Sequence, residues 1–242
     1  MVRLSVSAIG CYLSCGLKYK FCYIDKLPPQ VEIPVLKKGS EIHSLFESYS
    51  KSLPPVEITV EIIEQHKKMI PVKEYNKYKE HVDNFIELNK YIFNSIPSEK
   101  YFRPIAIEEE ILNEEWQFKG IIDAVYSDGK NILLLDFKTG KPSEDLGNWD
   151  YRFQLSCYKE IWDKKYPTMK VTHWGHFYSS VPLSNKNPLI EKVSENEMMK
   201  MLVKVENTRR RIMEGKFVKT QNTYQCNRCE YLPYCILGVS EV

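Results

Sequence analysis

Residues 117–140 read QFKGIIDAVYSDGKNILLLDFKTG, and this stretch decides the fold. Gln117–Tyr126 and Asn131–Phe137 are predicted strands, joined by Asp128-Gly129, a dipeptide typical of tight hairpin turns. The run Ile132–Leu135 is apolar on both faces, so we expect its strand to be central and covered by helices. The stretch therefore predicts an antiparallel pair of strands in the middle of a sheet.

Helical and strand patterns alternate outward from this hairpin. A capping-box pair, Ser194 with Glu197, and a stop at Gly215 bound the last helix. The order predicts an α/β fold, a small mixed β-sheet flanked by helices, within one domain spanning residues 1–242. The expected helices cover 7–22 (Ser7 as N-cap candidate), 39–52, 74–96, Tyr151–Tyr166 and Ser194–Glu214, and the expected outer strands are Ile105–Ile111 and Val171–Tyr178.

The composition argues against global disorder, because 43% of residues are hydrophobic and 12% are aromatic. A net charge of +2 does not point to nucleic acid by itself, so any basic surface must be local. The leading Leu4–Leu17 stretch is interrupted by serines and Gly10, and no small-residue cleavage pattern follows. No stretch approaches the ~20 apolar residues that span a bilayer. We expect a cytoplasmic protein with no membrane partner.

Two aspartates lie on opposite arms of the hairpin. Asp123 and Asp136 flank the turn at roughly equal distances, so strand pairing would bring their carboxylates across from each other. Buried and unpaired, each would cost several kcal/mol. A hard cation such as Mg²⁺ or Mn²⁺ removes that cost and leaves positions open for water and phosphate. The pair therefore predicts a divalent metal site.

Lys138 lies two residues beyond Asp136, so both side chains share one face of the strand. An ammonium group there can position or help deprotonate an attacking water, and it can stabilise charge that develops on phosphorus. Asp-x-Lys also occurs at ordinary solvated strand ends. The apolar run before Asp136 argues against that interpretation, since this strand should be buried on both faces.

Three further side chains have two interpretations each. Gln154 and Tyr158, four apart on one helix face, either cap the edge of the core or hold Lys138 and a phosphate oxygen. His43 is either a satisfied core histidine or a metal ligand. The acidic run Glu108–Glu110 is expected to be a solvated strand edge, with support of the metal ligands as the less favoured alternative.

The ordered set of motifs resembles the RecB-like branch of the PD-(D/E)XK nuclease superfamily, over about residues 5–237. The motifs are Gly39-x-x-x-His43, Gly120-x-x-Asp123, Asp136-x-Lys138-Thr139-Gly140 and Gln154-x-x-x-Tyr158. The resemblance implies a restriction-endonuclease-like core. It further implies that Lys138 is the catalytic lysine, assisted by Gln154 and Tyr158. By the same resemblance the catalytic metal is held by His43, Asp123, Asp136 and the Phe137 carbonyl.

Seven cysteines form two terminal groups and one isolated residue. The odd count argues weakly against a complete disulfide framework. Cys226-x-x-Cys229 with Cys235 gives three thiolates in a short tail, and a metal site needs a fourth ligand from elsewhere. Spacing alone does not choose among the N-terminal Cys11, Cys15 and Cys22, and a zinc knuckle or free thiols remain alternatives. The isolated Cys157 is expected in the core.

The segment around Tyr12-x-x-Cys15 is similar to that of the iron–sulfur nucleases of this branch, which include the CRISPR-associated RecB-like exonucleases and the AddB nuclease domain. The resemblance implies a [4Fe–4S] cluster held by Cys15, Cys226, Cys229 and Cys235. Residues 1–25 and 215–242 would then form a cluster subdomain, and the cluster would constrain the chain as a crosslink does. Gly16 departs from the family pattern, which often has proline there.

Three functions are consistent with these features. The first is a metal-dependent DNA nuclease, an exonuclease on single-stranded DNA or DNA ends. The second is a nuclease subunit active only with a helicase or within a CRISPR adaptation complex. The third, a non-catalytic nucleic-acid-binding protein, is disfavoured by the intact set Asp123, Asp136 and Lys138.

Local basic residues, some interspersed with aromatic ones, would suit a single strand of DNA. The absence of a Walker A pattern excludes a helicase motor in this sequence. A homo-oligomer is also compatible with the resemblance. The basic groups are Lys18/Lys20, Lys37/Lys38, Lys67/Lys68 and Arg209–Arg211.

Overall fold

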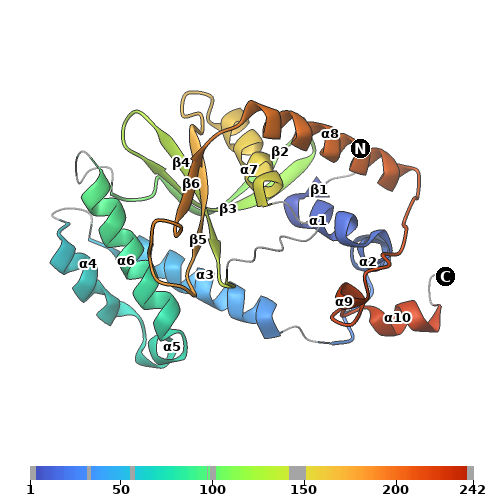
Figure 1. Cartoon of the computed structure of the whole chain (residues 1–242), viewed down its shortest axis with the longest axis horizontal. Helices are drawn as coiled ribbons and strands as arrows, with labels where there is room; N and C mark the ends of the chain where they lie inside the picture. The colour runs from blue at the N-terminus through green and yellow to red at the C-terminus, as the bar shows by residue number, and fades with distance from the viewer. Residues whose placement is uncertain are drawn as a thin grey trace.

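The computed structural model describes residues 4–31, 34–54, 58–96, 98, 102–141 and 151–238. Its centre is a six-stranded mixed sheet with helices packed against both faces (Figure 1). The strands are β1 (Leu4–Ser5), β2 (Ala106–Asn113), β3 (Phe118–Ser127), β4 (Ile132–Lys138), β5 (His173–Tyr178) and β6 (Leu189–Lys192). The expected α/β class, a mixed sheet flanked by helices, is confirmed.

The sheet has the order β1-β3-β4-β5-β6, and β2 pairs with β3. β2, β3 and β4 form an antiparallel meander, whereas β5 joins β4 in parallel through the crossover helix α7 (Tyr151–Lys165). The hairpin turn falls at Asp128–Asn131, where Gly129 has a φ of 88° and the Asp128 carboxylate accepts from two backbone amides. The predicted hairpin is therefore confirmed.

The apolar run of β4 packs into two separate cores. Leu134 belongs to the core that contains Trp162 and Trp174, while Leu135 and Phe137 belong to the core on the other face. This division confirms that β4 is central and covered on both faces, as continuous hydrophobic strands usually are.

Helices divide into two layers. Figure 1 shows one layer, α3 to α6, against one face of the sheet and a second layer, which includes α7 and α8, against the other. The first layer comprises α3 (Pro34–Ser52), α4 (Val60–His66), the 3-10 turn η2 (Lys67–Met69), α5 (Val72–Lys77) and α6 (Lys79–Ser95). The second comprises α1 (Val6–Ser14), α7 and α8 (Glu195–Met213).

Two predicted helices are interrupted. The helix expected over 7–22 starts after Ser5, whose side chain caps it by accepting from Ala8, so the N-cap assignment to Ser7 is wrong. It then breaks at Cys15 into α1, α2 (Gly16–Tyr19) and the π-turn η1 (Lys20–Ile24). The helix expected over 74–96 breaks at Tyr78. The last helix follows its prediction, with Ser194 as N-cap and Gly215 at a φ of 67° after its end.

Several short elements were not predicted from the sequence. β1 has two residues and β6 has four, too few to display alternation, and α4 has only seven. The tail contains two further short helices, α9 (Thr223–Cys226) and α10 (Leu232–Leu237).

The tail returns to the N-terminal helices (Figure 1). Lys18 pairs with Glu230 at 2.9 Å, and the hydroxyl of Tyr12 donates to the Lys216 carbonyl at 2.5 Å. Tyr19 stacks on Phe217 with ring centroids 6.1 Å apart. The two ends of the chain are thus in direct contact.

Candidate active site

The hairpin brings Asp123 of β3 and Asp136 of β4 together near the C-terminal end of β4. The β3–β4 ladder ends at the pair of Ala124 with Leu135, and Asp123 and Asp136 are the next residues on the two strands. Asp123 Oδ2 accepts a hydrogen bond from the Phe137 amide at 2.6 Å. Both carboxylates are buried, with exposed fractions of 7% and 2%. The arrangement agrees with the pairing expected from the turn.

An aromatic cluster beneath the site fixes α3 against β4. Phe46 of α3 stacks on Phe85 of α6 at 4.0 Å, and both rings contact Phe137 of β4 edge-on at 5.6 and 5.5 Å. His43 is one turn before Phe46, so this packing carries its imidazole to the carbonyl end of Phe137. His43 Nε2 lies 3.1 Å from the Phe137 carbonyl oxygen.

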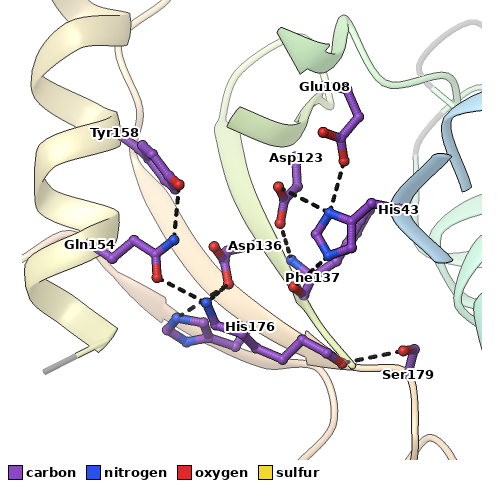
Figure 2. A network of polar contacts seen from close by, with 10 residues as sticks. His43, Glu108, Asp123, Asp136, Phe137, Gln154, Tyr158, His176 and Ser179 are labelled. Carbon is purple, nitrogen blue, oxygen red and sulfur yellow. Dashed lines mark hydrogen bonds and ion pairs between the residues drawn. The ribbon is translucent and has the colours of Figure 1, made fainter. Parts of the chain in front are cut away.

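Glu108 also faces the site, which corrects the expectation of a solvated strand edge for this residue. His43 Nδ1 donates to Glu108 Oε1 at 2.9 Å and lies 3.5 Å from Asp123 Oδ1 (Figure 2). Ligand atoms of His43, Glu108 and Asp123 all lie within 4.8 Å of one another. The ladder register places Glu108 opposite Asp123, since Ile107 pairs with Ala124 and Glu109 with Ile122.

The backbone is distorted where Glu108 and Asp123 meet. Glu108 has a φ of 46°, a left-handed conformation that costs a non-glycine residue about 1–3 kcal/mol. Strict alternation would place Ile122 and Val125 on opposite faces of β3, yet both pack in the same core. β2 shows the same change of face between Ala106 and Ile111. The distortion turns the Glu108 side chain into the site.

Lys138 contacts both the acidic pair and α7. Its ammonium lies 2.7 Å from Asp136 Oδ2 and donates to Gln154 Oε1 at 2.9 Å. Gln154 Nε2 in turn donates to the Tyr158 hydroxyl at 2.9 Å (Figure 2). Gly120 makes this approach of α7 possible, because a Cβ there would meet the Tyr158 ring at 2.9 Å.

Charge is unbalanced in the site. Burial alone would lower the pKa of His43, but the carboxylates of Asp123 and Glu108 outweigh it and raise that pKa to about 10. Burial raises the pKa of Asp136, opposed by the Lys138 charge and reinforced by Asp123. Burial disfavours the Lys138 ammonium, yet the Asp136 carboxylate more than offsets this and keeps the pKa of Lys138 above its ordinary value. Three carboxylates thus face two cations, an arrangement that favours a further positive charge.

One open pocket of about 380 Å³ collects these groups. Its polar lining suits a charged ligand. All the predicted catalytic and metal-site residues border it, namely His43, Asp123, Asp136, Phe137, Lys138, Gln154 and Tyr158, and Glu108 joins them.

Sequence reasoning missed one further neighbour of Asp136. His176 of β5 pairs with Asp136 across the parallel ladder, and its Nε2 lies 3.9 Å from Asp136 Oδ2. Burial lowers the pKa of His176 to about 4, so the ring is neutral at physiological pH. The sequence did indicate that His176 is buried, because it shares one face of a predicted strand with the apolar Trp174.

The terminal cysteines define a second site. Cys15, Cys226, Cys229 and Cys235 all line one cavity of about 230 Å³ between α2 and the tail. In the described part of the chain, neither Cys11 nor Cys22 borders this cavity. Cys157 is fully buried, in agreement with its predicted place in the core.

Backbone amides from both ends of the chain converge on Cys15. Its Sγ accepts from Lys18 N and from Thr220 N, each at 3.5 Å. A Cβ at Gly16 would lie 2.8 Å from Val218 N and 3.0 Å from its carbonyl oxygen. Gly16 therefore admits the tail backbone, which explains why glycine suits this position.

Most of the predicted basic groups are engaged within the protein. Lys18 pairs with Glu230, Lys20 with Asp25 and Lys67 with Glu64. Arg209 is buried and donates to the Trp116 carbonyl at 2.7 Å. Of the predicted basic groups, the exposed pair Lys37 and Lys38 on α3 lies nearest in sequence to a pocket residue, about one and a half turns before His43.

Within the described residues, the helices are all too short or too polar to cross a bilayer.

Comparisons with known proteins identify the fold and the family. A crystal structure from Eubacterium rectale, of a protein described as a candidate exonuclease, matches over 98% of this chain and 92% of that one, at 16% identity and a TM-score of 0.55. That match shows a shared fold. The crystal structure of SSO0001 matches over 96% of this chain and 84% of that one, at 13% identity and a TM-score of 0.39, and supports no argument. No curated protein matches the sequence.

The family model of the PD-(D/E)XK nuclease superfamily matches residues 3–236. The match spans both the sheet that carries the acidic pocket and the two cysteine-bearing ends. This chain belongs to the PD-(D/E)XK nuclease superfamily.

Proposed function

We propose that the protein is a metal-dependent DNA nuclease of the RecB-like branch, an exonuclease that acts on single-stranded DNA or on DNA ends. The observation that carries the proposal is the convergence of Asp123, Asp136 and Lys138 on one open, polar pocket. Membership of a nuclease superfamily gives phosphodiester hydrolysis as the reaction class. The candidate exonuclease with the same fold makes exonucleolytic action the first one to test.

The pocket residues fit a divalent cation. Asp136 is 2% exposed beside a second carboxylate, and burial of such a pair is unfavourable without a compensating charge. The carboxylate and carbonyl oxygens, which are the majority of the donors, suit Mg²⁺ or Mn²⁺. His43, Asp123, Asp136 and the Phe137 carbonyl would hold the ion. A bound ion would polarise the scissile phosphate and lower the pKa of a coordinated water.

Lys138 supplies a second positive charge from the protein itself. Although burial disfavours the ammonium, the Asp136 carboxylate holds the pKa of Lys138 above its ordinary value in the metal-free protein, so the resting side chain is charged. Gln154 Oε1 accepts a hydrogen bond from the ammonium and Asp136 takes a second, which leaves one N–H group for the pocket. We infer that Lys138 stabilises the charge that develops on the phosphate oxygens.

A [4Fe–4S] cluster is the proposed occupant of the cysteine cavity. Four cysteine side chains border one space, three from the tail and one from the α1–α2 junction, and cysteine thiolates are the usual ligands of such clusters. The two amides that point at Cys15 Sγ would stabilise a thiolate there. The cluster would join the two ends of the chain and stabilise the fold.

Incubation with end-labelled DNA tests the function. Anaerobically purified protein is expected to release mononucleotides or short products from single-stranded DNA with Mn²⁺ or Mg²⁺, and none with chelator. Circular single-stranded DNA should resist an exonuclease. Undiminished degradation in excess chelator would contradict metal dependence, and rapid cutting of circles would replace exonucleolytic with endonucleolytic action.

A further inference from the structure

We propose that Glu108 is a positioning residue of the metal centre. Its carboxylate holds the His43 imidazole through Nδ1, so that Nε2 faces the metal position beside the Phe137 carbonyl. The inference rests on the proposed function, because it assigns a role within the same metal site. It adds a residue from β2, a strand to which the motifs of the sequence assign no function.

The first argument concerns the two nitrogens of His43. Nδ1 faces Glu108 Oε1 at 2.9 Å and Asp123 Oδ1 at 3.5 Å. Both neighbours are acceptors, so Nδ1 must carry a hydrogen and cannot offer a lone pair. Nε2 faces only the neutral Phe137 carbonyl, so it is the nitrogen that would give up its hydrogen to a metal. Figure 2 shows the two carboxylates on one side of the ring and Phe137 on the other.

The second argument concerns the other side of the ring. Nε2 lies 3.1 Å from the Phe137 carbonyl oxygen. Two ligands at right angles around Mg²⁺ or Mn²⁺, each ~2.1 Å from the ion, are separated by about 3 Å. The separation of this pair therefore matches adjacent coordination positions. A histidine ligand whose other N–H is held by a carboxylate is a general arrangement in metal sites.

The third argument comes from the neighbours of Glu108. Glu109 binds Lys165 and Tyr166 at 2.6 and 2.5 Å, away from the pocket. Glu110 is exposed and lies 3.5 Å from Lys119. Of these three glutamates, Glu108 is the one whose carboxylate faces His43, and it is the residue with the distorted backbone. The side chain of Glu108 is 18% exposed, which restricts competition by water.

Mn²⁺ binding by the full-length protein tests the role. Titration under anaerobic conditions, followed by calorimetry and by electron paramagnetic resonance, is expected to give a Kd that rises about 10–100-fold in Glu108→Gln. Glu110→Gln, on the same strand, should bind as the wild type does. Glu108→Asp, which keeps a carboxylate, should bind more tightly than Glu108→Gln. Equal Kd values for Glu108→Gln and wild type would overturn the proposal.

A double-mutant cycle separates positioning from direct ligation. If Glu108 acts through His43, then Glu108→Gln adds little further loss in a His43→Ala background. The pulsed resonance signal of imidazole nitrogen coupled to Mn²⁺ should also weaken in Glu108→Gln. A full additional loss without His43 would make Glu108 a metal ligand and overturn the positioning role.

The proposed function is tested separately in the same series. Asp123→Asn should abolish Mn²⁺ binding at this site. If wild type and Asp123→Asn bind Mn²⁺ alike, the metal site itself fails. If Asp123→Asn loses binding while Glu108→Gln retains it, only the role of Glu108 fails.

Discussion

Asp123 Oδ2 accepts a hydrogen bond from the backbone amide of Phe137 at 2.6 Å, across the hairpin. The bond ties the aspartate of β3 to the peptide between Asp136 and Lys138, so the relative positions of the three groups are set by one turn. The same peptide segment offers its carbonyl oxygen toward His43. One short stretch of β4 thus links both sides of the pocket.

Replacement of Asp136 by alanine is expected to remove Mn²⁺- or Mg²⁺-dependent cleavage, with a loss of at least about 10²-fold in rate. The fold should persist at reduced stability, because the substitution removes a buried carboxylate but leaves the Lys138 ammonium without its partner at 2.7 Å. Single-turnover cleavage measures the loss of rate, and circular dichroism checks that the fold is retained. An unchanged cleavage rate would show that the site lies elsewhere.

Gln154→Ala tests the support of Lys138. The ammonium would keep its charge partner Asp136 but lose the acceptor 2.9 Å away, so we expect kcat to fall by about tenfold with little change in the apparent affinity for DNA. Arg152→Ala, on the same helix but paired with Glu191 outside the pocket, is the control. Equal rates for both variants would remove Gln154 from the catalytic apparatus.

Local rules predicted the hairpin and the approach of Asp123 to Asp136, whereas the places of His43 and the Phe137 carbonyl came only from the family resemblance. The turn at Asp128-Gly129 fixes the register, and the register brings Asp123 beside Asp136. Gln154 and Tyr158 share a face because they are four apart on a helix. These relationships need no knowledge of distant contacts.

Glu108 and Cys15 show where local rules were insufficient. The alternating pattern of the strand does not predict a φ of 46° at Glu108, because that conformation depends on packing against β3 and His43. The break at Cys15 depends on the tail, whose backbone reaches Gly16 and whose Thr220 amide donates to Cys15 Sγ. Both features arise from contacts between residues far apart in the chain.

In the metal-free protein, His43 should lose its proton at a higher pH than an ordinary histidine does. Its pKa is raised to about 10 from 6.5, so its contribution to stability is complete below about pH 6.5 and is lost as the pH rises through 10. Nuclear magnetic resonance of the imidazole should show a titration midpoint near pH 10. Mn²⁺ must displace the Nε2 proton, so its affinity should increase with pH over the same range. A titration near 6.5 would contradict the charged arrangement.

Cys229→Ser tests the cluster. Anaerobically purified wild type should be brown and contain about four irons and four sulfides per chain. Cys229→Ser should lose this colour and unfold at lower temperature, because the tie between the chain ends is lost. Cys11→Ser, outside the cavity, should keep the colour. A colourless wild type with one zinc per chain would replace the cluster with a zinc site.

The approach of the tail to α2 makes a prediction that is independent of any metal. Gly16→Ala would place a Cβ 2.8 Å from Val218 N, and backbone cannot move aside as a flexible side chain can. Such overpacking destabilises by about 1–3 kcal/mol. Gly140→Ala is the matched control, since no atom of the described residues lies within 4 Å of its added Cβ. Denaturant unfolding of the cluster-free proteins measures the difference. Equal stability of the two variants would mean that the tail does not dock against α2 as described, and the cysteine cavity would lose its structural basis.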